Sequence, residues 1–307
     1  DYGRRTAATH FLLGLRFAAA GQLSKAEQAF RQQVMQSREL IQRAPDSSTD
    51  RRELSQGLYY LAQVVQTRGR SAEAELLWRE QQTLVETMLR QQPEDARLHR
   101  SLAQVLGQLG DLDRVRGIRW RFAPPWPPSP APAHVGVALH NLSLLAMGPA
   151  YLKRAAALYR RGMQEERRLL KIDPARSMQH FTGLSRHAFA LVLVAEQRRS
   201  YEDMADAAEG AAEAARGLAS KPDGGRLYRL AAEYAANCAN LAGRAGHLSE
   251  QQRAAQARRH ADEAIALLRS AAAAGFRNAA DLEQASAFAS IRSRPDFQKL
   301  LAAMRQK

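Results

Sequence analysis

The sequence has very little cysteine and few aromatic residues. Of its 307 residues, one is cysteine (Cys238) and 7% are aromatic. A single cysteine excludes an intrachain disulfide and a cysteine-based zinc cluster, and it fits a reducing compartment, so we expect a cytoplasmic protein. The longest apolar run, residues 188–195, is far shorter than the roughly 20 residues that a membrane-spanning helix needs.

The sequence also lacks a convincing catalytic or metal-binding pattern. His180 and His187 are seven residues apart, whereas metal-binding pairs on helices more often lie at i and i+4. Glu165 and Glu166 have no convergent partner for acid–base chemistry. We therefore expect no catalytic residue, no metal and no cofactor in this chain.

Basic residues outnumber acidic ones. Lys and Arg number 45 against 31 Asp and Glu, which gives a formal charge of +14. Such a balance raises nucleic acid, acidic membranes and acidic proteins as partner classes. Most Arg doublets have Asp or Glu nearby, so pairing at i and i+4 on solvated helix faces could absorb much of this charge.

What is present is a repeat, first seen in residues 7–45. The spacing suits two antiparallel helices, because its apolar residues recur four apart on each side of a central glycine. The glycine would take positive φ in the turn. Ser24 and Ser71 are expected helix N-caps. The pattern consists of Leu13-Gly14, Phe17, Gly21, Ala26 and Phe30, closed by Pro45.

Three later segments repeat this pattern. The second follows after 48 residues, the third decays after its glycine, and the fourth recovers the pattern. In the first, second and fourth segments, a proline follows the aromatic residue by 15 positions. These segments contain Leu61, Val65, Gly69, Ala74, Trp78 and Pro93; Leu102, Leu106 and Gly110; and Leu142, Ala146, Ala155, Tyr159 and Pro174. The pattern resembles the tetratricopeptide repeat in residue type and spacing.

The fold is accordingly predicted to be all-α, a superhelical array of antiparallel helix hairpins with a short helical C-terminal cap. We expect N-terminal repeats over 1–122, a proline-rich linker over 123–133, C-terminal helical repeats over 134–275 and a capping tail over 276–307. In the tail, Pro295 suits the first position of a helix.

The chain resembles the C-terminal repeat region of planctomycete-type serine/threonine protein kinases over its whole length, weakly at 111–135 and most specifically at 226–301. The resemblance is carried by residues 226–235, 261–269, 273–277 and 291–301, and it departs from the usual pattern at Ala285-Ser286. It implies a non-catalytic arm that recruits substrates or senses signals. The Gly-rich loop, His-Arg-Asp and Asp-Phe-Gly motifs of a kinase domain are missing here, so we do not expect this chain to be an enzyme.

The concave surface lined by the first helix of each repeat is the best candidate for a binding site. Amides, an aromatic ring and a cation suit an extended protein segment, including an acidic one. Relatives that bind a C-terminal carboxylate use an Asn where this chain has Leu15, Gln63, Gln104 and Leu144, so we do not expect that ligand. The candidate residues are Tyr59, Gln63, Gln66, Arg100, Gln104 and His140.

Other interpretations remain open at this point. The candidate residues could simply be solvated, or the chain could be a free-standing adaptor. An RNA-binding helical repeat would explain the positive charge, but the sequence lacks an aromatic residue at regular repeat spacing for base stacking, so nucleic acid is less favoured.

Overall fold

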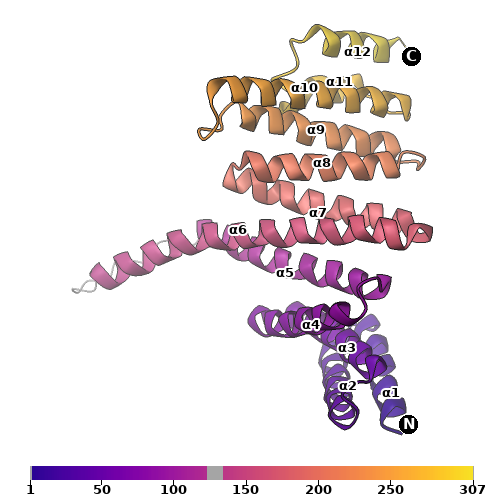
Figure 1. The fold of residues 1–307 in the computed structure, drawn as a ribbon. Helices are drawn as coiled ribbons and strands as arrows, with labels where there is room; N and C mark the ends of the chain where they lie inside the picture. The colour runs from indigo at the N-terminus through magenta and orange to yellow at the C-terminus, as the bar shows by residue number, and fades with distance from the viewer. Residues whose placement is uncertain (1, 123–133, 307) are drawn as a thin grey trace. The chain divides into compact units, whose positions relative to one another are not determined.

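The all-α prediction is confirmed by the computed structural model. It describes residues 2–122 and 134–306; for 119–122 and 134–147 it describes only the backbone. The described residues form twelve α-helices, two short 3-10 turns and no strand (Figure 1). His140 and the proline-rich segment 123–133 therefore lie outside the part whose side chains are described.

The helices follow one another along the chain. The long helices are α1 (Tyr2–Ala19), α2 (Leu23–Arg43), α3 (Ser48–Thr67), α4 (Ser71–Gln91), α5 (Ala96–Phe122), α6 (His134–Ile172), α7 (Ser177–Arg198), α8 (Tyr201–Gly217), α9 (Gly224–Ala242) and α10 (Glu250–Ala273). The chain ends with α11 (Ala279–Gln284) and α12 (Pro295–Arg305).

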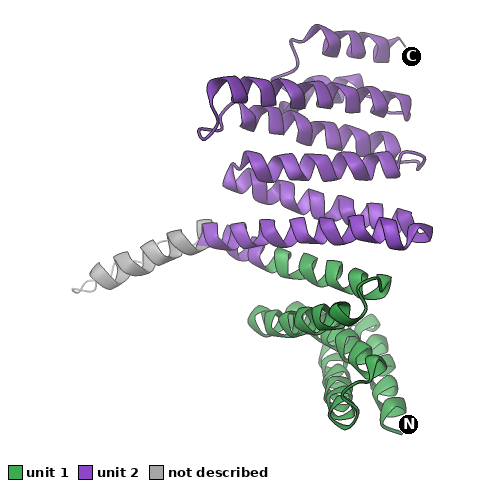
Figure 2. Ribbon diagram, in the orientation of Figure 1, with its two compact units in different colours: residues 1–112 green, residues 113–307 purple. Residues whose placement is uncertain are grey.

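The chain divides into two compact units, residues 1–112 and residues 113–307 (Figure 2). The boundary falls inside α5. We call them unit 1 and unit 2.

Unit 1 contains the two hairpins that the sequence predicts. Its turns place Gly21 at φ +71° and Gly69 at φ +85°, the left-handed region that glycine adopts without strain. Phe30 and Trp78, the aromatic residues of the two second helices, have no exposed surface. The predicted spacing therefore identifies both helix pairs and their core.

The predicted third and fourth repeats are wrong as separate hairpins. Helix α5 continues through Gly110, and α6 continues through the position between Ala146 and Ala155 where the repeat would turn. Near its end α5 packs on α6: Arg154 donates to Asp113 at 2.6 Å. A Cβ at Gly117 would lie 2.6 Å from the Leu152 side chain. The two partial repeats thus supply the two helices of one hairpin.

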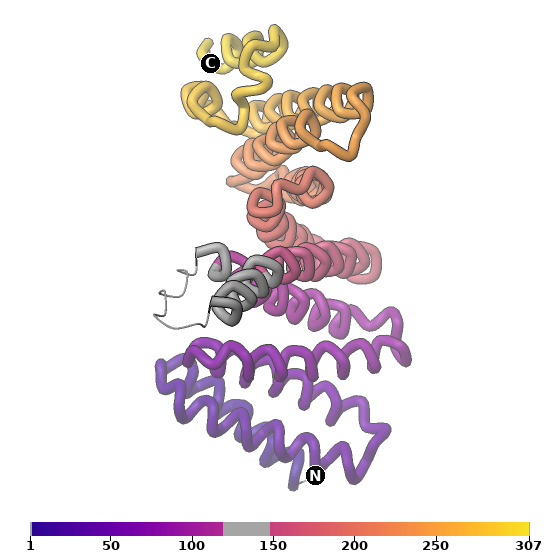
Figure 3. Tube along the Cα trace, turned by 90° about the vertical axis from the view of Figure 1, so that its left-hand side faces the viewer, coloured from indigo at the N-terminus to yellow at the C-terminus, as the bar shows by residue number. Residues whose placement is uncertain are grey.

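In unit 2, α6 to α10 pack in sequence, each against the next (Figures 1 and 3). The hairpins α7–α8 and α9–α10 lie within 134–275, where the sequence predicts helical repeats. Helix α12 packs on α10 and buries Phe297 and Leu301. Pro295 is its first residue, as predicted.

Helices in both units approach closely where one of them has a glycine. A Cβ at Gly14 would lie 2.5 Å from the Phe30 ring, and one at Gly57 would lie 1.6 Å from Gln33 Oε1. In unit 2, a Cβ at Gly183 would lie 2.0 Å from Glu166 Oε1. A real Cβ cannot come so close to its neighbours, so a larger residue would have to displace the packed Phe30 ring at Gly14, or the Gln33 and Glu166 side chains at the other two positions.

Arginine connects the second helices of successive hairpins. From α2, Arg38 pairs with Glu80 of α4 at 2.7 Å; from α6, Arg167 pairs with Glu213 of α8 at 2.7 Å. These partners are more than 40 residues apart in sequence. Charge is thus neutralised largely between helices, and not only at i and i+4 as the sequence suggested.

The expected N-caps are a further correction. Ser24 lies inside α2 and Ser71 is the first residue of α4, and neither helix has a side-chain cap. Ser47, Ser200 and Ser249 cap α3, α8 and α10 by accepting a hydrogen bond from the backbone N–H three residues on. The turns before α2 and α4 each contain a glycine at positive φ, which already reverses the chain there. A serine after such a turn is therefore a weak indicator of where the helix begins.

No helix among the described residues combines the length and apolar character needed to cross a bilayer. Nor does this part of the chain bring three or more His, Cys, Asp or Glu together in a way that could hold a metal ion.

The close contact at Gly14 gives a stability prediction. Gly14→Ala should lower the free energy of unfolding by about 1–3 kcal/mol, because the added methyl group overlaps the Phe30 ring. Gly246→Ala is the control, since a Cβ there meets nothing within 4 Å. Thermal unfolding followed by circular dichroism measures both, and equal melting temperatures would contradict the packing described.

Candidate functional site

A cavity of about 540 Å³ opens in unit 1 between α3 and α5, with α4 behind it. Its lining is mainly polar, with amide, hydroxyl and guanidinium groups beside two aromatic rings. The lining residues are Arg52, Ser55, Gln56, Tyr59, Tyr60 and Gln63 from α3, Gln81 from α4, and Arg97, Leu98, Ser101 and Gln104 from α5. We call it the α3–α5 groove.

Helical spacing explains why these side chains share a surface. On α5, Arg97, Ser101 and Gln104 stand at i, i+4 and i+7, which is one face of a helix. On α3, the lining residues from 52 to 63 follow the same period. The opposite face of α3 holds apolar residues such as Leu58 and Leu61, which are buried. Burial of one face of α3 therefore presents the polar face to the groove.

An aromatic cluster supports the α3 side of the groove. The Tyr60 ring stacks on Phe30 of α2 with centroids 5.7 Å apart and meets Phe11 of α1 edge-on at 5.4 Å. Tyr59 in turn packs edge-on against Tyr60 at 5.4 Å. Such ring pairs stabilise their arrangement beyond simple burial. Tyr59 is therefore held in a defined position at the groove surface.

The start of α3 is held to the turn before α5. Arg52 donates to Asp95 at 2.7 Å and to Gln92 at 2.8 Å. Because Asp95 also accepts from the backbone N–H groups of Arg97 and Leu98, it joins Arg52 to the first turn of α5. These contacts fix the spacing of the two groove walls at one end.

Gln81 is the buried polar residue of the groove. It is 2% exposed, and its Oε1 has no hydrogen-bond partner among the described residues. A buried amide oxygen without a partner is costly, typically by about 1–3 kcal/mol. A ligand N–H group that reached it would remove that cost. The groove thus offers an acceptor to whatever occupies it.

The groove is electropositive. Two cations, Arg52 and Arg97, line it and no carboxylate does. Because Arg52 is paired with Asp95, the unpaired charge comes from Arg97. Arg97 is exposed and makes no ion pair among the described residues. Amides and hydroxyls can pair with peptide groups, while a guanidinium prefers a carboxylate. This arrangement suits an extended segment with an acidic side chain.

The structure brings only some of the sequence-predicted residues together in the groove. Tyr59, Gln63 and Gln104 line the groove together. Gln66 and Arg100 are half-buried and do not line it. His140 is in the first part of α6, residues 134–147, whose side chains are not described.

Sequence reasoning missed Arg97 and Gln81 as groove residues. Arg97 could have been found, because it lies seven residues before Gln104 and so shares its face. Nothing in the sequence indicates that Gln81 is buried, because a glutamine in the second helix of a repeat is normally expected to face solvent. Its burial depends on how α3, α4 and α5 pack.

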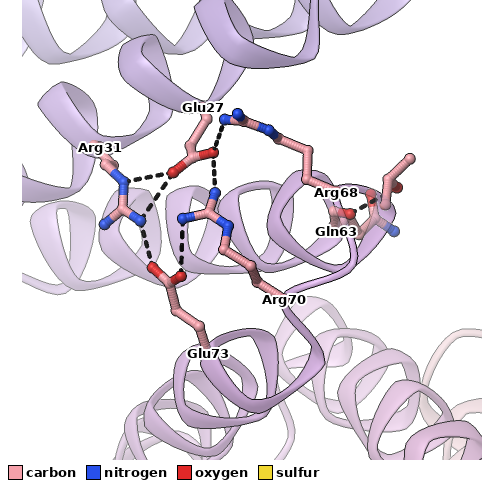
Figure 4. Close-up of polar contacts among 7 residues, drawn as sticks. Glu27, Arg31, Gln63, Arg68, Arg70 and Glu73 are labelled. Atoms are coloured by element: carbon pink, nitrogen blue, oxygen red, sulfur yellow. Dashed lines mark hydrogen bonds and ion pairs between the residues drawn. The ribbon is translucent and has the colours of Figure 1, made fainter.

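A network of charged residues joins α2 to the turn between α3 and α4 (Figure 4). Glu27 of α2 is 6% exposed and accepts from Arg31 at 2.9 Å and from Arg68 and Arg70 in the turn. Arg70 also bonds Glu73 at 3.0 Å. Burial alone would raise the pKa of Glu27, but hydrogen bonds from Arg70, Arg31 and Arg68 outweigh it and lower that pKa to about 2.

The other sequence candidates have structural surroundings. His180 is buried with Nδ1 3.4 Å from Glu166 Oε2, and His187 packs on the Tyr159 ring. Cys238 is fully buried, and burial raises the pKa of its thiol to about 12. A thiol with so high a pKa is a poor nucleophile.

Comparison with known proteins adds no assignment: no protein-family model matches the chain, and no curated protein matches it.

The Glu27 network predicts a pH-dependent stability. Glu27→Gln should lower the free energy of unfolding at pH 7 by about 1–3 kcal/mol, since it removes charged hydrogen bonds to half-exposed arginines. The folded-state pKa lies below the unfolded value near 4.5, so Glu27 stabilises the protein above that pH, and the stabilisation is lost as pH falls toward about 2.

Urea unfolding of both proteins from pH 7 to pH 3 measures this. The difference between them should shrink as pH falls below 4.5. A difference that stays constant with pH would show that the carboxylate charge is not responsible.

Proposed function

We propose that unit 1 binds an extended protein segment in the α3–α5 groove, and that the chain is an interaction scaffold with the superhelical arrangement of tetratricopeptide repeats. The observation that supports this most is the groove itself. It has peptide-like hydrogen-bonding groups, two rings and two cations over about 540 Å³. An acidic segment fits best, because no carboxylate lines the groove.

The test begins with selection of binders from a random peptide display library on the immobilised protein. Fluorescence anisotropy then gives the Kd of the selected peptides for the wild type and for the triple variant Tyr59→Ala, Gln63→Ala, Gln104→Ala. We expect Kd to rise about tenfold or more, since loss of hydrogen bonds and ring packing costs at least about 1.4 kcal/mol in total.

The matched control is Ser24→Ala, Gln28→Ala, Thr83→Ala, three exposed residues of unit 1 outside the groove. Peptides that bind the groove variant and the control equally well would contradict the proposal. Selected peptides without Asp or Glu would contradict the acidic preference alone.

We further propose that this scaffold is the non-catalytic substrate-recruiting or sensing arm of a bacterial serine/threonine protein kinase. The support is the sequence resemblance of residues 226–301. Sequencing of the natural reading frame upstream of the codon for Asp1 tests it. A Gly-rich loop, His-Arg-Asp and Asp-Phe-Gly there would agree with the proposal, whereas a nearby start codon would favour a free-standing adaptor.

A further inference from the structure

The positive charge of the chain is concentrated in unit 2. Unit 1 contains 15 Lys and Arg against 13 Asp and Glu, and unit 2 contains 30 against 18. Unit 2 therefore carries +12 of the total +14. The α3–α5 groove belongs to unit 1, so it does not account for this charge.

Much of the excess lies along one edge of unit 2. Figure 1 shows that the α6–α7 and α8–α9 turns lie on one side, and the α7–α8 and α9–α10 turns on the other. Exposed cations occupy the first of these sides, on the turns or on the adjoining helix ends. They are Lys171, Arg176, Arg216, Lys221, Arg226, Arg269 and Arg277, which we call the basic edge.

Close contacts join the turns into one continuous surface. At the end of α8, a Cβ on Gly217 would lie 2.3 Å from the Phe181 ring of α7. At the start of α9, a Cβ on Gly225 would lie 2.9 Å from the backbone N of Phe276, just after α10. The cations at the α6–α7 turn, at the α8–α9 turn and at the end of α10 thus form three neighbouring groups on one surface.

Few carboxylates balance the basic edge. Asp173 lies 3.9 Å from Arg176, and Arg277 donates to backbone carbonyls at the end of α10. Asp223 lies in the same turn as Lys221, and Arg216 acts electrostatically on Glu263 of α10. None of the other five cations forms a close ion pair with a carboxylate among the described residues. Their charge is available to a ligand, and mutual repulsion among them would be relieved by an anion.

We infer that the basic edge binds a single nucleic-acid strand through its phosphates, independently of the groove in unit 1. The cations occur in groups separated by the width of a helix hairpin. A nucleic-acid strand carries one charge per nucleotide, so a phosphate meets each group in any register, whereas an acidic peptide would need its carboxylates at matching intervals.

The side-chain chemistry also fits phosphate binding. The helix dipoles add no net positive field, because α6, α8 and α10 end at this edge and only α7 and α9 begin there. Five of the seven cations are arginine, whose planar guanidinium pairs with two phosphate oxygens at once. The aromatic rings at the edge, Phe181 and Phe276, are half-buried, so binding should depend little on base sequence.

The edge ends in a hollow of about 330 Å³ between α10 and α12. Arg269 and Arg277 line it together with the apolar side chains of Leu300 and Met304. Two guanidinium groups beside an apolar wall suit a phosphate and the sugar attached to it.

The test measures binding of fluorescein-labelled 20-nucleotide oligo(U) by anisotropy from 50 to 300 mM KCl. We expect the logarithm of affinity to fall linearly with the logarithm of salt concentration. In Lys171→Gln, Lys221→Gln, Arg226→Gln, Arg269→Gln the slope should decrease by about 0.7 for each phosphate that the variant no longer neutralises, so by about 2–3 in all.

The control is Lys153→Gln, Arg186→Gln, Arg244→Gln, Arg258→Gln, which removes the same charge from exposed positions of unit 2 away from the edge. Equal losses of affinity in the two variants would contradict a defined site. Equally strong competition by poly-glutamate would overturn the nucleic-acid assignment in favour of an acidic protein. An edge variant that melts earlier and binds unchanged would show that these cations only stabilise helix ends.

Discussion

The fold depends on helices that approach one another closely at glycine. At Gly57 the side chain of Gln33 occupies the space that a Cβ would take, and Gln33 donates from there to the backbone carbonyl of Glu53 at 2.9 Å and to Ser37 at 3.0 Å. This contact sets α3 against α2 along its buried face. The opposite face of α3 is then free to form the groove with α5. The site in unit 1 is thus a consequence of packing on its other side.

Arginine has three different roles in this chain. In unit 1, Arg68 and Arg70 neutralise the buried Glu27 and fix a turn. In both units, arginines pair with carboxylates of the next hairpin, where the planar guanidinium gives a defined geometry. On the basic edge, arginines have no such partners. The net charge of the whole chain therefore does not show that the unpaired positive charge is concentrated on the basic edge.

Part of this could be predicted from the sequence, because local rules govern it. The spacing around Gly21 and Gly69 predicts both hairpins of unit 1. The outward face of a repeat's first helix predicts Tyr59, Gln63 and Gln104. The hairpin of α5 and α6 could not be predicted, because a weak glycine signal at Gly110 competes with a helix stabilised by contacts such as Asp113–Arg154. Gln81 was missed because its burial depends on three helices at once.

The central claim is that the α3–α5 groove holds a protein segment, and site-specific photo-cross-linking tests it most directly. Benzoylphenylalanine would replace Gln63 in the groove or, in a separate protein, Arg79 on the exposed surface of α4. Each protein is irradiated with a selected acidic peptide and analysed by mass spectrometry. The account predicts a covalent adduct from position 63 and none from position 79. Equal yields at both positions, or an adduct from position 79 alone, would contradict it.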